Sequence, residues 1–120
     1  MNMLSSVLVG VVAVLHLGFL VLEMFFWNKP LGRRVFALSP ELAAGSAPLA
    51  ANQGLYNGFL AAGLIWSLFG GEQAYAIRIF FLVCVIVAGI FGALTAKRSI
   101  LFVQALPGAL ALIATVLAHR

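Results

Sequence analysis

The sequence predicts an all-α membrane protein, a four-transmembrane-helix bundle with a short interfacial helix in its first loop. Two observations support this fold class. Of the 120 residues, 64% are hydrophobic and only 8% are charged, and the mean hydropathy is +1.16. A soluble domain of this length cannot bury so much apolar surface. The apolar residues also fall into runs of roughly 20, the length of a membrane-crossing helix. We expect a single integral membrane domain over residues 1–120.

The first predicted span covers residues 4–27 and carries no charge before Glu23. It lacks the basic start of a secretory signal, so we expect it to be retained. In the first loop, Ser39, Pro40 and Glu41 have the form of a helix start and predict the short interfacial helix. Further spans are expected at residues 48–69, 75–96 and 99–118. Pro107 lies within the last of these and frees a backbone carbonyl there.

Basic residues determine the predicted orientation. Most of them lie in the first and third loops: Lys29, Arg33, Arg34, Lys97 and Arg98. Such loops face the cytoplasm, which predicts a multi-pass protein of the bacterial cytoplasmic (inner) membrane with both termini outside. The lipid bilayer is the expected partner. Nucleic acid is excluded, because the basic residues are few and form no stripe. We expect Arg78, near the outer end of its span, to extend to the headgroups.

Polar residues gather in the cytoplasmic half of three of the four predicted spans. Counted from the inner interface at about 1.5 Å per residue, Glu23 lies roughly 6 Å deep and His16 roughly 16 Å. The polar start of the second span and Gln104 fall between these depths. This predicts a ligand pocket in the cytoplasmic half, lined by His16, Glu23, Trp27, Asn52, Gln53, Tyr56, Asn57 and Gln104.

Residue spacing places these groups on shared helix faces. His16 and Glu23 are two turns apart on one face, and Gln53 shares a face with Asn57. Gly54 and Gly58 form a G-x-x-x-G pattern, which is typical of closely packed membrane helices. We expect the second span to approach its neighbours most closely there.

A family resemblance rests on two motifs. His16, Glu23, Met24, Phe25 and Trp27 form the pattern H-x6-E-M-F-x-W, and "ANQGLYNGFLAAGL" follows at residues 51–64. Together they resemble the bacterial DUF1304 family of small membrane proteins. The resemblance covers essentially the whole chain and implies four spans in the cytoplasmic membrane. It implies no particular activity.

Three functions fit this pattern. The first is binding or transport of a small amphipathic or cationic molecule, with Glu23 as counter-charge and His16 as proton acceptor; ionisable groups within a membrane are commonly functional. The second is an intramembrane enzyme in which these two residues transfer protons on a lipid-like substrate. The third is a structural partner whose polar groups only specify helix packing. Whether the protein is an enzyme therefore stays open, as does a homodimer.

The sequence predicts no metal site and no cofactor. The two histidines are far apart in the chain, and a zinc site needs three or four ligands. Cys84 lies in an apolar run without a nearby cysteine or histidine, so we expect it to be inert.

The predicted orientation can be tested with reporter fusions. Alkaline phosphatase fused to the C-terminus should be active and a fluorescent reporter there should be dark, because five of the seven basic residues lie in the first and third loops. Activity of the fluorescent fusion would place the C-terminus in the cytoplasm and invert every depth given above.

Overall fold

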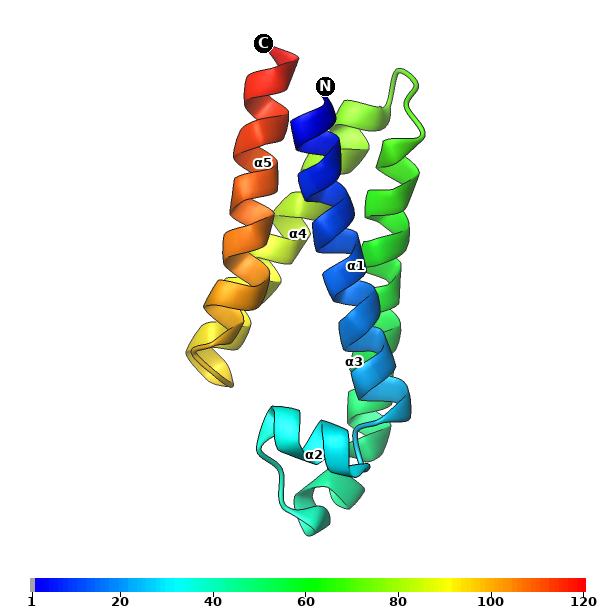
Figure 1. The fold of residues 1–120 in the computed structure, drawn as a ribbon, viewed down its shortest axis with the longest axis vertical. Coiled ribbons are helices and arrows are strands. Elements are labelled where there is room, and N and C mark those ends of the chain that lie inside the picture. The colour runs from blue at the N-terminus through cyan, green and yellow to red at the C-terminus, as the bar shows by residue number, and fades with distance from the viewer. Residues whose placement is uncertain (1) are drawn as a thin grey trace. The chain divides into compact units, whose positions relative to one another are not determined.

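The structure of residues 2–120 is a computed structural model whose regular elements are all helices (Figure 1). No strand occurs in this part of the chain, so the all-α prediction is confirmed. In chain order the elements are α1 (Met3–Phe25), α2 (Pro30–Phe36), α3 (Pro40–Leu68), α4 (Ala74–Thr95), the π-helix η1 (Leu101–Ala105) and α5 (Leu106–His119).

Three helices within residues 2–120 are long and apolar enough to cross a membrane, rather than the four expected. These are α1, α4 and the continuous segment Leu101–His119, which combines η1 and α5. The second predicted span lies within α3, which at 29 residues is long enough. Between residues 41 and 57, however, α3 carries Glu41 and the amide side chains of Asn52, Gln53 and Asn57. The α3 helix is therefore long enough to cross a membrane, but its polar side chains make it less apolar than the other three segments.

The first loop contains a short helix, but not where the sequence predicts it. That helix is α2, which runs for seven residues from Pro30 to Phe36 and is followed by Ala37 in the left-handed conformation (φ 54°). Pro40 does begin a helix, and Ser39 Oγ accepts a hydrogen bond from the Leu42 N–H at 3.1 Å. This helix is α3, which continues through Pro48 to Leu68 instead of ending within the loop. The helix start predicted at Ser39–Glu41 is therefore present, but the prediction of a short, separate helix there is wrong.

The chain forms two compact units. Unit 1 contains the chain up to Leu15 together with Leu60–Arg120, and unit 2 contains His16–Phe59. Both α1 and α3 contribute to each unit. Unit 1 has an apolar core of small and branched side chains: Val9, Val12, Ala13, Leu64, Leu82, Val85 and Ala111.

Within unit 1, α4 packs against both η1 and α5. The contact with η1 is close, since a Cβ on Gly89 would lie 2.7 Å from the backbone nitrogen of Ala105. The π-helix ends two residues before Pro107, and the Leu106 N–H donates a hydrogen bond to the carbonyl of Leu101. Proline has no N–H and its ring clashes with the preceding turn, so a break in the α-helical ladder is expected at this point.

Adding a methyl group at Gly89 should destabilise unit 1. In Gly89→Ala the new Cβ meets backbone atoms of Ala105 at 2.7–3.0 Å, and these cannot move aside as a flexible side chain could. We expect a loss of about 1–3 kcal/mol, seen as a lower unfolding temperature in detergent. Gly10→Ala is the matched control, because nothing lies within 4 Å of its added Cβ. Equal unfolding temperatures for the two variants would contradict the packing described here.

Candidate functional site

Unit 2 brings α1 and α3 together at a glycine. A Cβ on Gly54 would lie 2.7 Å from Met24 Cγ, 3.1 Å from Glu23 Cβ and 3.2 Å from the carbonyl oxygen of Leu20. One turn further along α3, a Cβ on Gly58 would lie 2.7 Å from Leu20 Cδ1. The G-x-x-x-G pattern thus provides the close helix approach that the sequence predicts.

Next to this contact, Asn57 and Glu23 form a hydrogen bond between the two helices. Asn57 Nδ2 donates to Glu23 Oε1 at 2.5 Å. Asn57 is 5% exposed and Glu23 is half-buried. The structure shows no ion pair and no second hydrogen bond to Glu23 within residues 2–120. The carboxyl group therefore has one neutral donor and no cationic partner in this part of the chain.

Trp27 lies in unit 2, and its indole nitrogen already donates a hydrogen bond there. The indole N–H donates to Ser46 Oγ at 2.9 Å, and Ser46 Oγ donates in turn to the Leu42 carbonyl. The Trp27 ring packs on Phe36 of α2 with 4.7 Å between ring centroids. These contacts give Trp27 a structural role, joining α2 to the start of α3.

His16 has none of its surface exposed. Its ring meets the Phe19 ring edge-on, with 5.2 Å between centroids. The described residues contain no group of three or more His, Cys, Asp or Glu side chains that could hold a metal ion.

The polar run of α3 divides between two environments. Asn57 is buried, whereas Asn52, Gln53 and Tyr56 are exposed. The sequence predicts Gln53 and Asn57 on the same helix face, but Asn57 is buried and Gln53 is exposed. Tyr56 keeps 51% of its surface exposed, and its ring lies 6.0 Å from that of Phe59. Of the α3 candidates, Asn57 alone is hydrogen-bonded to a candidate from α1 among residues 2–120.

Gln104 belongs to a different part of the structure from the other candidates. It is half-buried on η1 in unit 1, whereas the remaining seven lie in unit 2. A pocket that includes Gln104 stays a prediction.

Arg78, in unit 1, is a buried polar residue whose burial the sequence analysis did not predict. Arg78 is 2% exposed, so the prediction that it extends to the headgroups is wrong. Its guanidinium donates to Ser67 Oγ and the Ser67 carbonyl at 3.4 Å, and to Ser5 Oγ at 3.3 Å. The signal in the sequence is spacing, because Ser5 and Ser67 each lie one helical turn from an apolar core residue.

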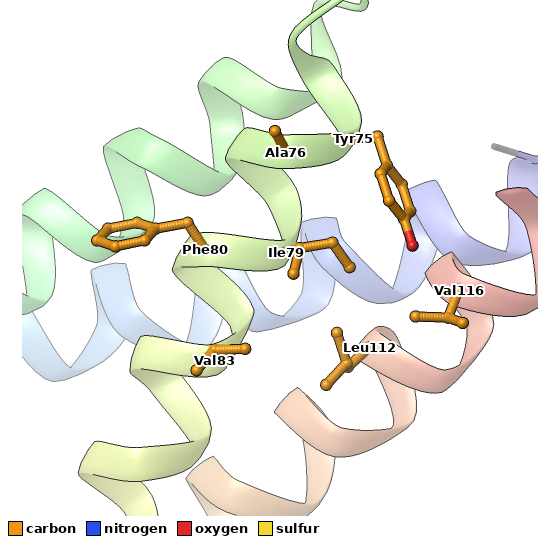
Figure 2. Close-up of a pocket in the computed structure, with 7 residues that line it drawn as sticks. All are labelled: Tyr75, Ala76, Ile79, Phe80, Val83, Leu112 and Val116. Atoms are coloured by element: carbon orange, nitrogen blue, oxygen red, sulfur yellow. The ribbon is translucent and has the colours of Figure 1, made fainter.

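An open groove of about 700 Å³ lies between α4 and α5 (Figure 2). Its lining is apolar apart from the Tyr75 hydroxyl: Tyr75, Ala76, Ile79, Phe80, Val83, Leu112 and Val116. At one end the Tyr75 ring stacks on His119, with 3.6 Å between centroids. None of the predicted site residues lines this groove, so it differs from the pocket expected from the sequence.

The fold and its buried polar groups define a class, that of a small all-helical protein with helices apolar enough for a membrane. A family model described as "Protein of unknown function (DUF1304)" matches residues 10–116, and the chain belongs to this family. The chain is also similar to the uncharacterized protein YpaA of Lactococcus lactis subsp. lactis (strain IL1403), with 30% identity over 118 residues and 97% of each chain covered. No solved structure matches.

Removing the Asn57 amide should weaken the contact between α1 and α3. We expect Asn57→Ala to lower the free energy of unfolding by about 0.5–1.5 kcal/mol, because Glu23 loses its neutral donor. In a Glu23→Ala background the same change should have less effect, giving a measurable coupling energy in a double-mutant cycle. Thermal unfolding in detergent, followed by tryptophan fluorescence, measures all four variants. Asn52→Ala, exposed on the same helix, is the control; an equal effect of Asn52→Ala and Asn57→Ala would contradict this pairing.

Proposed function

We propose that this protein is a four-span membrane protein that binds or transports a small amphipathic or cationic molecule, with Glu23 as the counter-charge. One observation carries the proposal. The Glu23 carboxyl lies half-buried in an apolar helix, bonded to the neutral amide of Asn57 and to no cation within residues 2–120. A carboxylate in such surroundings gains more from a cationic ligand than one exposed to water.

The Asn57 hydrogen bond suits a binding group better than a purely structural one. It holds one carboxyl oxygen in place from a helix fixed by Gly54 and leaves the other oxygen to a ligand. Pre-positioning of this kind lowers the cost of ordering side chains when a ligand binds. We assign the exposed polar side chains of the same helix, Asn52, Gln53 and Tyr56, to the approach to Glu23.

We take residues 48–69, of which 48–68 lie in α3, to be the second of the four spans. At about 1.5 Å per residue this stretch is long enough to cross a hydrocarbon core of about 30 Å. Its amide groups are then tolerated because they face protein or the site rather than lipid, which is the usual place for polar groups in membrane helices. The basic first and third loops put the site toward the cytoplasmic side of the inner membrane, with both termini outside. A homodimer is compatible with this arrangement and is not required by it.

Proton-transfer catalysis is the weaker alternative. A general acid or base must come within hydrogen-bond reach of its substrate. His16 has no exposed surface, so no observation favours its direct contact with a substrate. We therefore assign the ligand-contacting role to Glu23.

Replacing the charge at residue 23 while keeping the hydrogen bond tests the proposal. Glu23→Gln retains an oxygen that can accept from Asn57, so the unfolding temperature should stay close to that of the unchanged protein. With tetraphenylphosphonium as the probe, calorimetry in detergent should show affinity at least about tenfold weaker for Glu23→Gln, roughly 1.4 kcal/mol. Glu41→Gln, exposed at the start of α3, should bind normally.

Two results would refute the assignment. One is equal affinity of the probe for Glu23→Gln and for the unchanged protein. The other is a large loss of stability in Glu23→Gln with no binding in either protein, which would make Glu23 a packing residue.

A further inference from the structure

Four helices of unit 1 contribute to a polar layer directly beyond its apolar core. Each polar residue lies about one helical turn from a core residue on the same helix: Ser5 from Val9, Ser67 from Leu64, Arg78 from Leu82 and Thr115 from Ala111. All four are at most 2% exposed. The layer is close to the helix ends, because Ser67 is the penultimate residue of α3 and Arg78 lies about 6 Å from the start of α4.

The hydroxyl groups of this layer are oriented by the backbone. Ser5 Oγ donates to the Asn2 carbonyl at 2.9 Å, and Ser67 Oγ donates to the Leu64 carbonyl at 2.6 Å. Each hydroxyl proton is thereby occupied, which leaves the oxygen lone pairs to accept from Arg78. Two of the guanidinium hydrogen bonds go to these oxygens and a third goes to the Ser67 carbonyl.

These contacts leave the guanidinium under-satisfied. Its three hydrogen bonds are 3.3–3.4 Å long, beyond the usual 2.9–3.0 Å or so for N–H···O. All its partners in residues 2–120 are neutral, and Glu72, the acidic residue nearest in sequence, is exposed and forms no ion pair with it. Thr115 Oγ1 is buried and has no hydrogen-bond partner in the same part of the chain. A buried charge without a counter-ion is strongly unfavourable.

We propose that the Arg78 layer is a binding site for an oxyanion of the phosphate class. A guanidinium binds phosphate oxygens through paired, charge-assisted hydrogen bonds that are shorter and stronger than those to neutral acceptors. The Thr115 hydroxyl supplies a further donor.

The phosphate can belong to a lipid headgroup or be free in solution. Ile79 and Val116, the sequence neighbours of Arg78 and Thr115, line the apolar groove between α4 and α5 (Figure 2). Arg78 and Thr115 do not line the groove themselves, so a lipid whose phosphate binds Arg78 would have its acyl chain on the adjoining face of α4 and α5, where the groove lies. Free phosphate would bind the same donors without using the groove.

Thermal unfolding of the full chain in detergent separates these sources. Inorganic phosphate is compared with chloride at matched ionic strength, and mixed micelles that contain phosphatidylglycerol are compared with mixed micelles that contain a neutral galactolipid, which lacks phosphate. A rise in unfolding temperature with inorganic phosphate identifies a site for an oxyanion that is free in solution. A rise with phosphatidylglycerol alone identifies a headgroup site. No rise with either overturns the proposal.

Variants show whether Arg78 is responsible. Arg78→Gln should abolish the rise while its own unfolding temperature, without anion, is unchanged or higher, because a buried uncompensated charge is removed. Arg120→Gln, an exposed basic residue after α5, should keep the rise, as should Glu23→Gln, which belongs to the other proposed site. An undiminished rise in Arg78→Gln overturns the proposal.

Thr115→Val provides an independent test if Arg78→Gln does not fold. Valine matches threonine in shape and removes only the hydroxyl. We expect about tenfold weaker anion affinity, the effect of losing one hydrogen bond to a charged group. Unchanged affinity in this variant removes Thr115 from the site and overturns the layer as proposed.

Discussion

The close approach of α1 and α3 at Gly54 is the contact on which unit 2 depends. No side chain separates the helices there, and even a single Cβ added to Gly54 would lie only 3.1 Å from Glu23 Cβ and 3.2 Å from the Leu20 carbonyl oxygen. Only at such a distance can a side chain as short as Asn57 reach Glu23. A larger residue at Gly54 would widen the gap and leave both polar groups unsatisfied in apolar surroundings, where an unmade hydrogen bond is costly.

Glu23 and Arg78 show the same physical problem handled in two ways. Each is an ionisable side chain on an apolar helix, and each has only neutral hydrogen-bond partners within residues 2–120. Glu23 is half-buried and has one short contact, from Asn57. Arg78 is enclosed and has three long contacts from α1 and α3. The two groups therefore differ in burial and in the length of their hydrogen bonds rather than in the kind of partner they have.

The sequence names Glu23 and Asn57 among its candidate residues, and the structure joins these two by a hydrogen bond. The glycine pattern at residues 54 and 58 is visible in the sequence as well, and it lies at the close approach of α1 and α3. Residue spacing alone does not show which of two neighbouring side chains on one helix is buried, however. Gln53 and Asn57 share a predicted face, yet Asn57 is buried and Gln53 is exposed. Burial depends on which helix packs there, and spacing within one helix does not contain that information.

The helical class, three helices long and apolar enough to cross a membrane, and the glycine pattern at residues 54 and 58 could all be predicted from the sequence, because apolar run length and residue spacing are local properties. Only the tertiary structure decided that the helix begun at Pro40 continues to Leu68, and that Arg78 turns inward to Ser5, 73 residues away in sequence. A long side chain near a helix end can extend to the headgroups or fold into the bundle. The choice depends on acceptors supplied by other helices, which only the folded chain brings within reach.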